Sequence, residues 1–371
     1  MSPTTVWCLK LKKFNMEKAN SSLKRSTLTL QKTAAAACLL SVLSFSAHLA
    51  NAANTPSKPV RYNITELNPL PGAREGTAYS INNQGVVAGR SGKDDGTYVA
   101  VLWRNGQIQT LGGLGGAFSE AHSINDSGEI VGAAQVKSGL YHAFFWVHGH
   151  MQDLGVLPNG LYSYAEAVNG GGTVTGFADN GSGIPHAFLW TGSGLKDLGP
   201  APGVGGSSAL GINRKGAVVG GSSLDSDDGG VAFIYTGQFK AITGFPPKFG
   251  SLARAVNDSG TVVGTYGQTV RRAYPFAWQS GRITVLPTGR STPYAVATSI
   301  NSSGVIAGYY LGTAESRAAI WVDHKMIDLN QVIPGGTDWT LLQATGINDH
   351  GLIIGRARYH GRDVGFLLTP K

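Results

Sequence analysis

One nine-residue phrase recurs seven times along the chain and is the strongest constraint on its fold. Its clearest copy is INDSGEIVG, from Ile124 to Gly132, and every copy keeps the Asn, the Gly three residues later and a second Gly four residues after that. Successive copies are separated by 43 residues, then by 44 residues four times, then by 47. This period matches one four-stranded blade of a β-propeller. The repeated residues are Asn82, Asn125, Asn169, Asn213, Asn257, Asn301 and Asn348.

Each copy of the phrase has the pattern of a tight β-hairpin. Asn at the first turn position accepts a hydrogen bond from the backbone two residues on, and the first Gly adopts positive φ without a Cβ clash. The second Gly ends the next strand, where we expect a β-bulge or a close approach of two backbones. An apolar run ending in an aromatic residue follows, as in HAFFW, and then a fourth strand such as MQDLG. Each repeat therefore predicts four strands, with aromatic rings packed between neighbouring blades.

The two ends of the chain are predicted to share one blade. In six repeats a Leu or Ile of the fourth strand follows the Asn by 28 or 29 residues, but in the seventh the chain ends first. The fourth strand missing from the seventh repeat has a counterpart near the start of the chain, in YNITELNPLPG. There Leu67 precedes Asn82 by 15 residues, just as Leu154 of a fourth strand precedes Asn169. We predict an all-β, seven-bladed β-propeller of four-stranded blades, with residues 60–67 completing the last blade. Closure by this strand pairs the sheet edge that an unfinished last blade would leave open.

The first 52 residues differ in composition from the rest. They hold seven basic residues and one acidic residue, followed by the apolar run TAAAACLLSVLSFSA and the small-residue site ANA. This order predicts a signal peptide over residues 1–52, cleaved after Ala52, and a single propeller domain over 53–371. A membrane anchor is the alternative, but the apolar run is shorter than the roughly 18 residues of a membrane span. Met16 is an alternative start to Met1, because it gives a leader of more ordinary length.

Composition excludes several classes of function. The net charge of +8 would suggest nucleic-acid binding, but beyond the leader the chain holds 23 basic and 21 acidic residues. Both cysteines, Cys8 and Cys38, lie in the leader, so the mature chain has no disulfide or cysteine metal site. Glycine makes up 53 of 371 residues, as expected for a turn-rich β protein. We expect a secreted or periplasmic monomer with no membrane span, cofactor, bound metal or nucleic-acid partner.

The chain resembles the HAF-repeat family of extracellular bacterial proteins. The triplet that gives the family its name stands at His142 to Phe144 and at His186 to Phe188. The resemblance covers residues 60–371 and rests on the repeated Asn–Gly phrase, the HAFLW strand and the DLG strand together. It implies export and a repeated architecture, and it brings no catalytic motif. Since only two of seven copies keep the whole triplet, we interpret these histidines as structural, each bonded to the adjoining blade rather than to a metal.

Positions at which the repeats differ predict a site at one mouth of the central channel. The innermost strand reads Ala, a variable residue, a small residue, Ile or Val, then Asn, and the variable residue should face the channel where the connecting loops enter. The variable residues are Tyr79, His122, Glu166, Leu210, Arg254, Thr298 and Thr345. Because side chains alternate along a strand, Glu120 lies on the same face as His122, and Tyr164 lies on the same face as Glu166. The candidate ligand-binding residues are Tyr79, Glu120, His122, Tyr164, Glu166, Arg254 and Trp339.

Trp339 joins these candidates for a different reason. It is the only tryptophan of the mature chain outside the aromatic strand, and it lies in the connection lengthened by the 47-residue interval. An exposed ring there could stack on a sugar or anchor a partner, and a hydrophobic plug over the loop is the alternative.

Three hypotheses of function follow from these patterns. The first is a non-enzymatic propeller that binds a glycan or a protein at the channel mouth, because the chain has no G-x-S-x-G, HExxH or phosphate-binding glycine loop. The second is an extracellular hydrolase or lyase that uses His122 with Glu120 or Glu166 as acid and base. The third is a structural envelope component whose channel rim is hydrated and empty of ligand.

Overall fold

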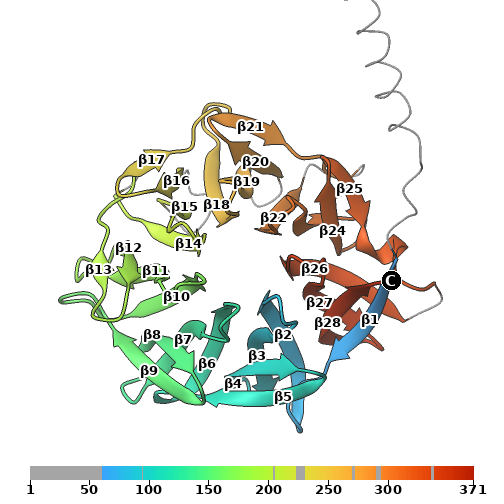
Figure 1. The fold of residues 1–371 in the computed structure, drawn as a ribbon, viewed down its shortest axis with the longest axis horizontal. Coiled ribbons are helices and arrows are strands. Elements are labelled where there is room, and N and C mark those ends of the chain that lie inside the picture. Colours follow the sequence, from blue (N-terminus) through green and yellow to red (C-terminus); the bar gives the residue numbers. More distant parts are fainter. Residues whose placement is uncertain are drawn as a thin grey trace, which may run out of the picture. The chain divides into compact units, whose positions relative to one another are not determined.

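The described strands form a ring of seven four-stranded antiparallel sheets around a central axis (Figure 1). The structure is a computed structural model and describes residues 61–371 apart from positions 94, 204, 223–229, 270–271, 290–293 and 336–337. Contacts divide the chain into Met1–Pro59 and Val60–Lys371. The predicted signal peptide and its cleavage site lie outside the described residues. The prediction of a seven-bladed propeller is confirmed.

In each blade the strands follow one another outward from the axis. The innermost strands are β2 (Ala73–Ile81), β6 (Gly115–Ile124), β10 (Ser163–Val168), β14 (Ser208–Ile212), β18 (Gly250–Val256), β22 (Ala295–Ile300) and β26 (Trp339–Ile347). The second strands are β3 (Val87–Lys93), β7 (Ile130–Val136), β11 (Val174–Asp179), β15 (Val218–Gly221), β19 (Val262–Thr269), β23 (Ile306–Leu311) and β27 (Ile353–Tyr359).

The outer half of each blade consists of the aromatic strand and a short edge strand. The third strands are β4 (Tyr98–Arg104), β8 (Tyr141–Val147), β12 (Pro185–Trp190), β16 (Ala232–Tyr235), β20 (Arg272–Gln279), β24 (Ser316–Val322) and β28 (Arg362–Pro370). The fourth strands are β5 (Gln107–Gly112), β9 (His150–Gly155), β13 (Lys196–Asp197), β17 (Phe239–Ala241), β21 (Arg282–Val285), β25 (Lys325–Asp328) and β1 (Tyr62–Leu67).

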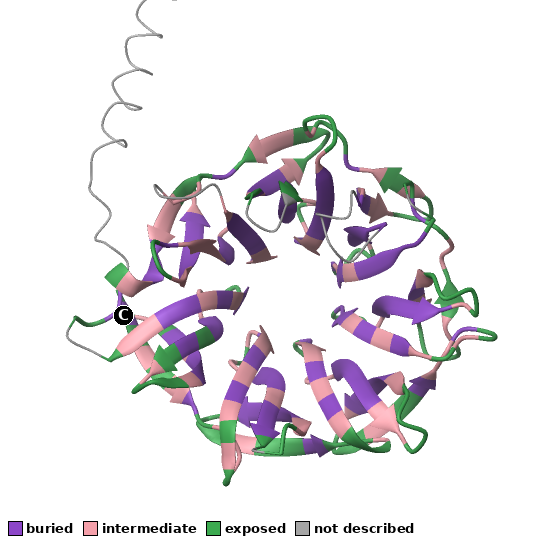
Figure 2. Cartoon of the chain, turned by 180° about the vertical axis from the view of Figure 1, so that it is seen from behind, coloured by how far each residue is buried: buried purple, intermediate pink, exposed green. Residues whose placement is uncertain are grey.

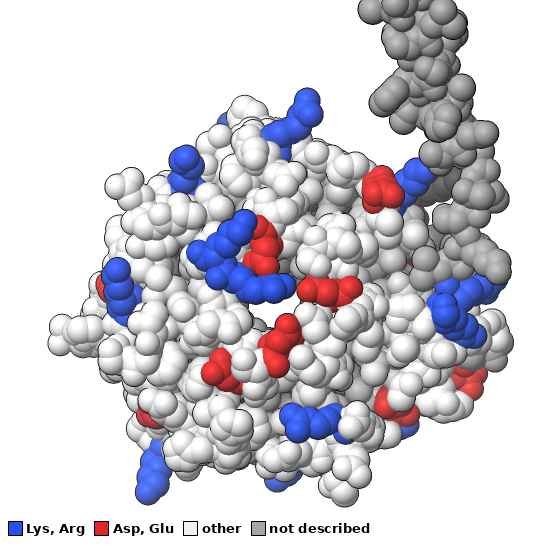
Figure 3. All heavy atoms as spheres, in the orientation of Figure 1, with Lys and Arg blue, Asp and Glu red and all other residues white. Residues whose placement is uncertain are grey.

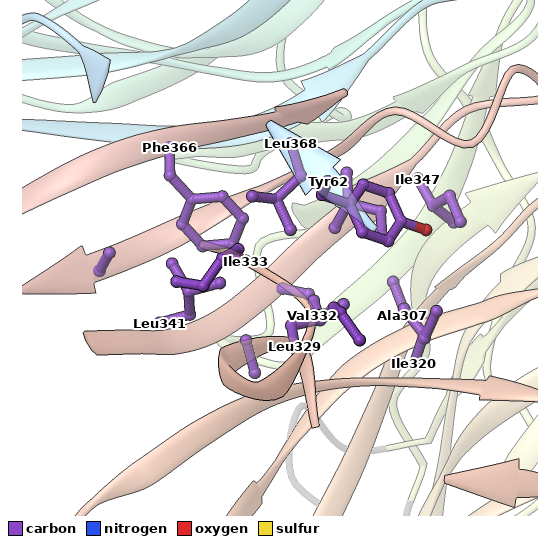
Figure 4. Close-up of a cluster of buried hydrophobic side chains, with 14 of the residues drawn as sticks. Tyr62, Ala307, Ile320, Leu329, Val332, Ile333, Leu341, Ile347, Phe366 and Leu368 are labelled. Atoms are coloured by element: carbon purple, nitrogen blue, oxygen red, sulfur yellow. The ribbon is translucent and has the colours of Figure 1, made fainter. Parts of the chain in front are cut away.

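The N-terminal strand β1 completes the last blade, as predicted. It pairs antiparallel with β28, and Tyr62 lies opposite Pro370. The Tyr62 backbone also donates to the carbonyl of Val332, just after the short 3-10 helix η3 (Leu329–Gln331). Figure 4 shows the Tyr62 ring among the buried side chains that join the sixth and seventh blades. Strand β1 is therefore held by its sheet and by the core between two blades.

The hydrophobic core lies between neighbouring sheets rather than at one centre. Each blade face packs on the next, and one such cluster contains Val131 of β7 together with Phe188 and Trp190 of β12. The rings of Phe145 and Trp190, from adjacent blades, have centroids 5.1 Å apart. Figure 2 shows the buried residues along the strands and the exposed ones in the outer turns. The predicted packing of aromatic rings between blades is confirmed.

The second Gly of each phrase faces a β-bulge in the innermost strand. In the second blade Gly132 pairs with Ala121, and the register shifts between Ala121 and Ser123. A Cβ on Gly132 would lie 2.0 Å from the Glu120 carbonyl oxygen, so no other residue fits there without a backbone shift. The same pairing recurs in all seven blades. Both the expected bulge and the expected backbone approach are present.

The repeated Asn side chains fasten each blade to the next. Asn125 Oδ1 accepts hydrogen bonds from the backbone of Ser127 and Glu129, which holds the hairpin turn as predicted. Its Nδ2 donates to the carbonyl of Asn169 in the following blade at 2.9 Å. Equivalent bonds between blades come from all seven Asn residues and form a closed circle. The blade-to-blade bond was not predicted from the sequence.

The two HAF histidines bond within their own blades, so the predicted bond to the adjoining blade is wrong. His142 Nδ1 lies 2.9 Å from a carboxylate oxygen of Asp153, and His186 Nδ1 lies 3.0 Å from one of Asp197. Each aspartate belongs to the DLG strand, which pairs directly with the HAF strand in the same sheet. The pair links the third strand to the fourth, which explains why the two motifs occur together.

Candidate functional site

A cavity of about 510 Å³ opens at the end of the channel where the loops from preceding blades enter. We call it the entry cavity. Its volume lies within the range of about 300–1,000 Å³ that is typical of small-ligand sites. Every blade contributes at least one side chain to it. The lining residues are Tyr79, Glu120, His122, Tyr164, Glu166, Phe177, Leu210, Arg254, Thr298 and Thr345.

The β-bulges place the variable residues in this cavity. In every innermost strand the variable residue is the extra residue that the register skips, as His122 is between Ala121 and Ser123. A bulge redirects the side chain of its extra residue, and bulges are frequent beside functional sites. Six of the seven sequence candidates, all except Trp339, lie together in the entry cavity.

His122 lines the cavity and lies between two carboxylates. Its Nε2 is 3.5 Å from Glu120 Oε1, and its Nδ1 is 3.5 Å from Glu166 Oε1. Nδ1 also donates to the carbonyl of Ala165 at 3.0 Å. The three side chains are only 15%, 17% and 23% exposed for His122, Glu120 and Glu166. The cluster is thus largely shielded from water while still lining the cavity.

The two carboxylates shift the protonation of His122. Burial by itself lowers the pKa of the imidazole, but Glu166 and Glu120 outweigh burial and raise the pKa to about 9. Burial also works to raise the pKa of Glu120, yet His122 and Arg90 hold it below its ordinary value. For Glu166 burial prevails and the pKa is raised, because burial and the charge of Glu120 together outweigh the lowering by His122 and Arg254. At neutral pH His122 is therefore an imidazolium beside the ionised Glu120.

An aromatic wall forms one side of the cavity. The Tyr164 ring stacks on Phe177 at 5.2 Å and on Tyr141 of the neighbouring blade at 5.5 Å. The Tyr79 ring meets the His122 ring edge to face at 5.9 Å. Burial raises the pKa of Tyr79 and of Tyr164 to about 12, so both hydroxyls remain protonated and can donate. Rings held on both faces present fixed edges to a ligand.

The opposite side of the rim is fastened to the backbone. Thr298 donates to the carbonyl of Ala344 in the next blade, and Thr345 donates to that of Ala78. Leu210 adds an apolar side chain. These hydroxyls hold neighbouring blades together, so the polar groups open to a ligand concentrate in blades one to three and at Arg254.

Arg90 and Phe177 belong to the site but were missed from the sequence. Arg90 Nη1 lies 3.1 Å from Glu120 Oε2, and its guanidinium covers the Tyr98 ring at 4.5 Å. Phe177 supports Tyr164. Both residues directly follow the second Gly of their repeats, a position that also varies from blade to blade. Comparing that position as well as the innermost strand would have found them.

Trp339 lies apart from the entry cavity. It begins β26 instead of belonging to the connection, and its half-buried ring stacks on Tyr359 with centroids 4.1 Å apart. Both rings pack against the core between the sixth and seventh blades. This packing agrees better with the alternative of a hydrophobic plug than with an exposed ring that binds a sugar or a partner.

The other end of the channel has a different lining. This end, the hairpin mouth, is a space of about 250 Å³ around the repeated Asn residues. Arg214 Nε lies 2.8 Å from Asp258, and its guanidinium reaches toward Asp349 of the last blade at 3.8 Å. Figure 3 shows acidic and basic side chains gathered around the central opening. Here the arginine has carboxylate partners, in contrast to Arg254.

Among the described residues, no three His, Cys, Asp or Glu side chains are grouped so that they could hold a metal ion. In the same part of the chain no helix has the length and apolar character needed to cross a membrane.

Comparisons with known proteins bear on the fold. No family model and no curated protein sequence matches the chain. Among solved structures it is similar to an inactive variant of virginiamycin B lyase from Staphylococcus aureus, at 13% identity and a TM-score of 0.51, over 82% of this chain and 99% of that one. It is also similar to a puromycin-hydrolyzing peptidase from Mycobacterium tuberculosis, at 11% identity and a TM-score of 0.51, over 80% of this chain and 50% of that one. These likenesses show the propeller fold alone.

Proposed function

We propose that this protein is an exported binding propeller of the HAF-repeat group that takes a glycan into the entry cavity. The observation that carries the proposal is the convergence of six polar candidates from four blades on one cavity of ligand size. The cavity combines aromatic edges with fixed donors and acceptors, which suits a sugar ring with its apolar face and its hydroxyls. A protein partner would need a much larger contact area of about 800 Å² on each side.

Thermal unfolding with a glycan panel tests this proposal. A ligand at about 100 times its dissociation constant stabilises a protein by about 2.7 kcal/mol, which raises the melting temperature measurably. We expect a glycan shift that disappears in His122→Gln and Glu166→Gln. The matched control is Asp126→Asn at the hairpin mouth, where the carboxylate bonds to Asn83 and is remote from the entry cavity. Equal shifts in all four proteins would place binding elsewhere, and no shift with any glycan would favour a structural envelope role.

A second candidate function is an extracellular hydrolase or lyase. The observation that favours it is the pairing of an imidazolium, His122, with an ionised carboxylate, Glu120, in one shielded cluster. Such a pair supplies a general acid and a general base. Turnover of a bound glycan should then vanish in His122→Gln when it is measured well below the melting temperature of that variant, so that lost turnover is not lost folding. A glycan that binds without any turnover excludes this candidate for that glycan.

Export is a proposal that rests on the leader sequence. If residues 1–52 are a signal peptide, the protein recovered from the periplasm or the medium begins at Ala53. N-terminal sequencing of the recovered protein tests this. A product that retains the leader in the membrane fraction would support the anchor instead.

A further inference from the structure

The entry cavity contains one cationic side chain, Arg254, that has no hydrogen-bond or ion-pair partner among the described residues, although its charge lowers the pKa of Glu166. Of its four charged residues, Glu120 contacts both Arg90 and His122, and Glu166 shares His122. Arg254, by contrast, makes no ion pair or hydrogen bond within the described part of the chain. Its Nε is buried and without an acceptor. A buried donor that lacks an acceptor destabilises the folded protein, so an acceptor supplied by a ligand would recover that free energy.

We infer that the ligand of the entry cavity is an acidic saccharide, a sugar unit whose carboxylate is held by Arg254. This inference rests on the proposed function and names its ligand class. The guanidinium offers donors in a planar fork that matches a carboxylate in two parallel hydrogen bonds. The rest of the sugar would face Glu120, His122 and the hydroxyl groups of Tyr79 and Tyr164, which line the same cavity.

The nearby acidic residues favour a carboxylate over a phosphate. Glu120 and Glu166 line the same cavity as Arg254, so a dianion would meet two like charges there. A single negative charge meets less repulsion. Burial raises the pKa of Glu166, and a proton on Glu166 removes one of the like charges. Binding should therefore strengthen as the pH falls toward the raised pKa of Glu166, while His122, whose pKa is about 9, stays protonated.

At the opposite end of the channel, an arginine forms ion pairs with carboxylates. Arg214 points into the hairpin mouth and contacts the carboxylates of Asp258 and Asp349. The two arginines stand at opposite ends of one channel, and Arg214 forms ion pairs whereas Arg254 forms none with the described residues. Arg214 is therefore a matched control, since its removal takes the same charge from the same channel.

Isothermal titration with oligogalacturonate and oligoglucuronate, each compared with its methyl ester, tests the inference. Esterification removes the negative charge and keeps the sugar rings. The wild type should bind at least one free acid about tenfold or more tightly than its ester, and added salt should reduce this preference. Arg254→Gln should abolish the preference, Arg254→Lys should restore part of it, and Arg214→Gln should leave it unchanged.

The outcomes separate this inference from the function on which it rests. Equal affinity for acid and ester in the wild type, or a preference that survives in Arg254→Gln, overturns the acidic-saccharide inference. If neutral glycans bind to the wild type but not to Glu166→Gln, the proposed binding function stands and only the acidic-saccharide inference fails. If no glycan binds in either form, both fail. If Arg254→Gln and Glu166→Gln have melting temperatures close to that of the wild type, their loss of binding is not caused by loss of folding.

Discussion

Asn348 Nδ2, in the last blade, donates a hydrogen bond of 3.0 Å to the carbonyl oxygen of Asn82, in the first. This bond is the seventh of a circle in which each repeated Asn holds its own turn and the next blade. The ends of the ring meet twice, here at the channel and at the outer edge where β1 joins β28. The recurring phrase is therefore needed once per blade for closure as well as for the hairpin.

Removal of one member of this circle should destabilise the whole ring. In Asn348→Ala the carbonyl of Asn82 and the amides of His350 and Leu352 lose their buried partner. Each loss costs about 1–3 kcal/mol, so we expect at least about 3 kcal/mol in the free energy of unfolding. Asn83→Ala removes an adjacent but more exposed amide and should cost less. Denaturant unfolding measures the free energy of unfolding of both variants. An equal loss in Asn348→Ala and Asn83→Ala would show that the circle of Asn bonds adds no stability.

Loss of the N-terminal strand should open the ring at its outer edge. A chain that begins at Asn68 lacks the partner of β28 and the buried Tyr62 ring. The exposed strand edge should cause aggregation. A peptide of residues 60–68 added in trans should bind and restore solubility, whereas the same peptide with Tyr62→Asp should not. Light scattering measures this, and a soluble, stable truncated chain would contradict the role of β1 in closure.

Substitution of the glycine opposite a bulge should disturb the site. In Gly132→Ala the new Cβ would lie 2.0 Å from the Glu120 carbonyl oxygen, so the bulge that carries His122 must move. The control is Gly128→Ala in the hairpin, where φ is +79° and the side chain meets open space. It should cost about 1–2 kcal/mol through backbone strain alone. NMR titration should show a lowered His122 pKa in the first variant and an unchanged one in the second.

Stability should fall as pH rises through the titration of His122. Its folded pKa of about 9 exceeds the ordinary 6.5, so the pairing with Glu166 and Glu120 is fully present below pH 6.5 and is lost between about 6.5 and 9. The melting temperature of the wild type should drop more over this window than that of His122→Gln. Identical slopes for the two proteins would show that the imidazolium is not stabilised in the folded state.

Much of the fold and part of the site could be predicted because the relevant signals are local and repeated. A turn Asn and a positive-φ Gly act within nine residues, so seven copies predict seven hairpins directly. Equal spacing from Leu67 to Asn82 and from Leu154 to Asn169 located the strand that closes the ring. Strand alternation then assigned Glu120 and Tyr164 to the faces of their variable neighbours, and both line the entry cavity.

Contacts between distant residues were decided only by the tertiary structure. The bond from Asn348 to Asn82 spans 266 positions, and no local pattern specifies which carbonyl an amide will reach. Likewise the partner of His142 depended on which strand pairs with β8, and the stacking of Trp339 on Tyr359 depended on how two strands align. Arg254 was recognised as a channel residue from its position in the repeat. That its buried Nε has no acceptor among the described residues follows only from the packing of all seven blades around one axis.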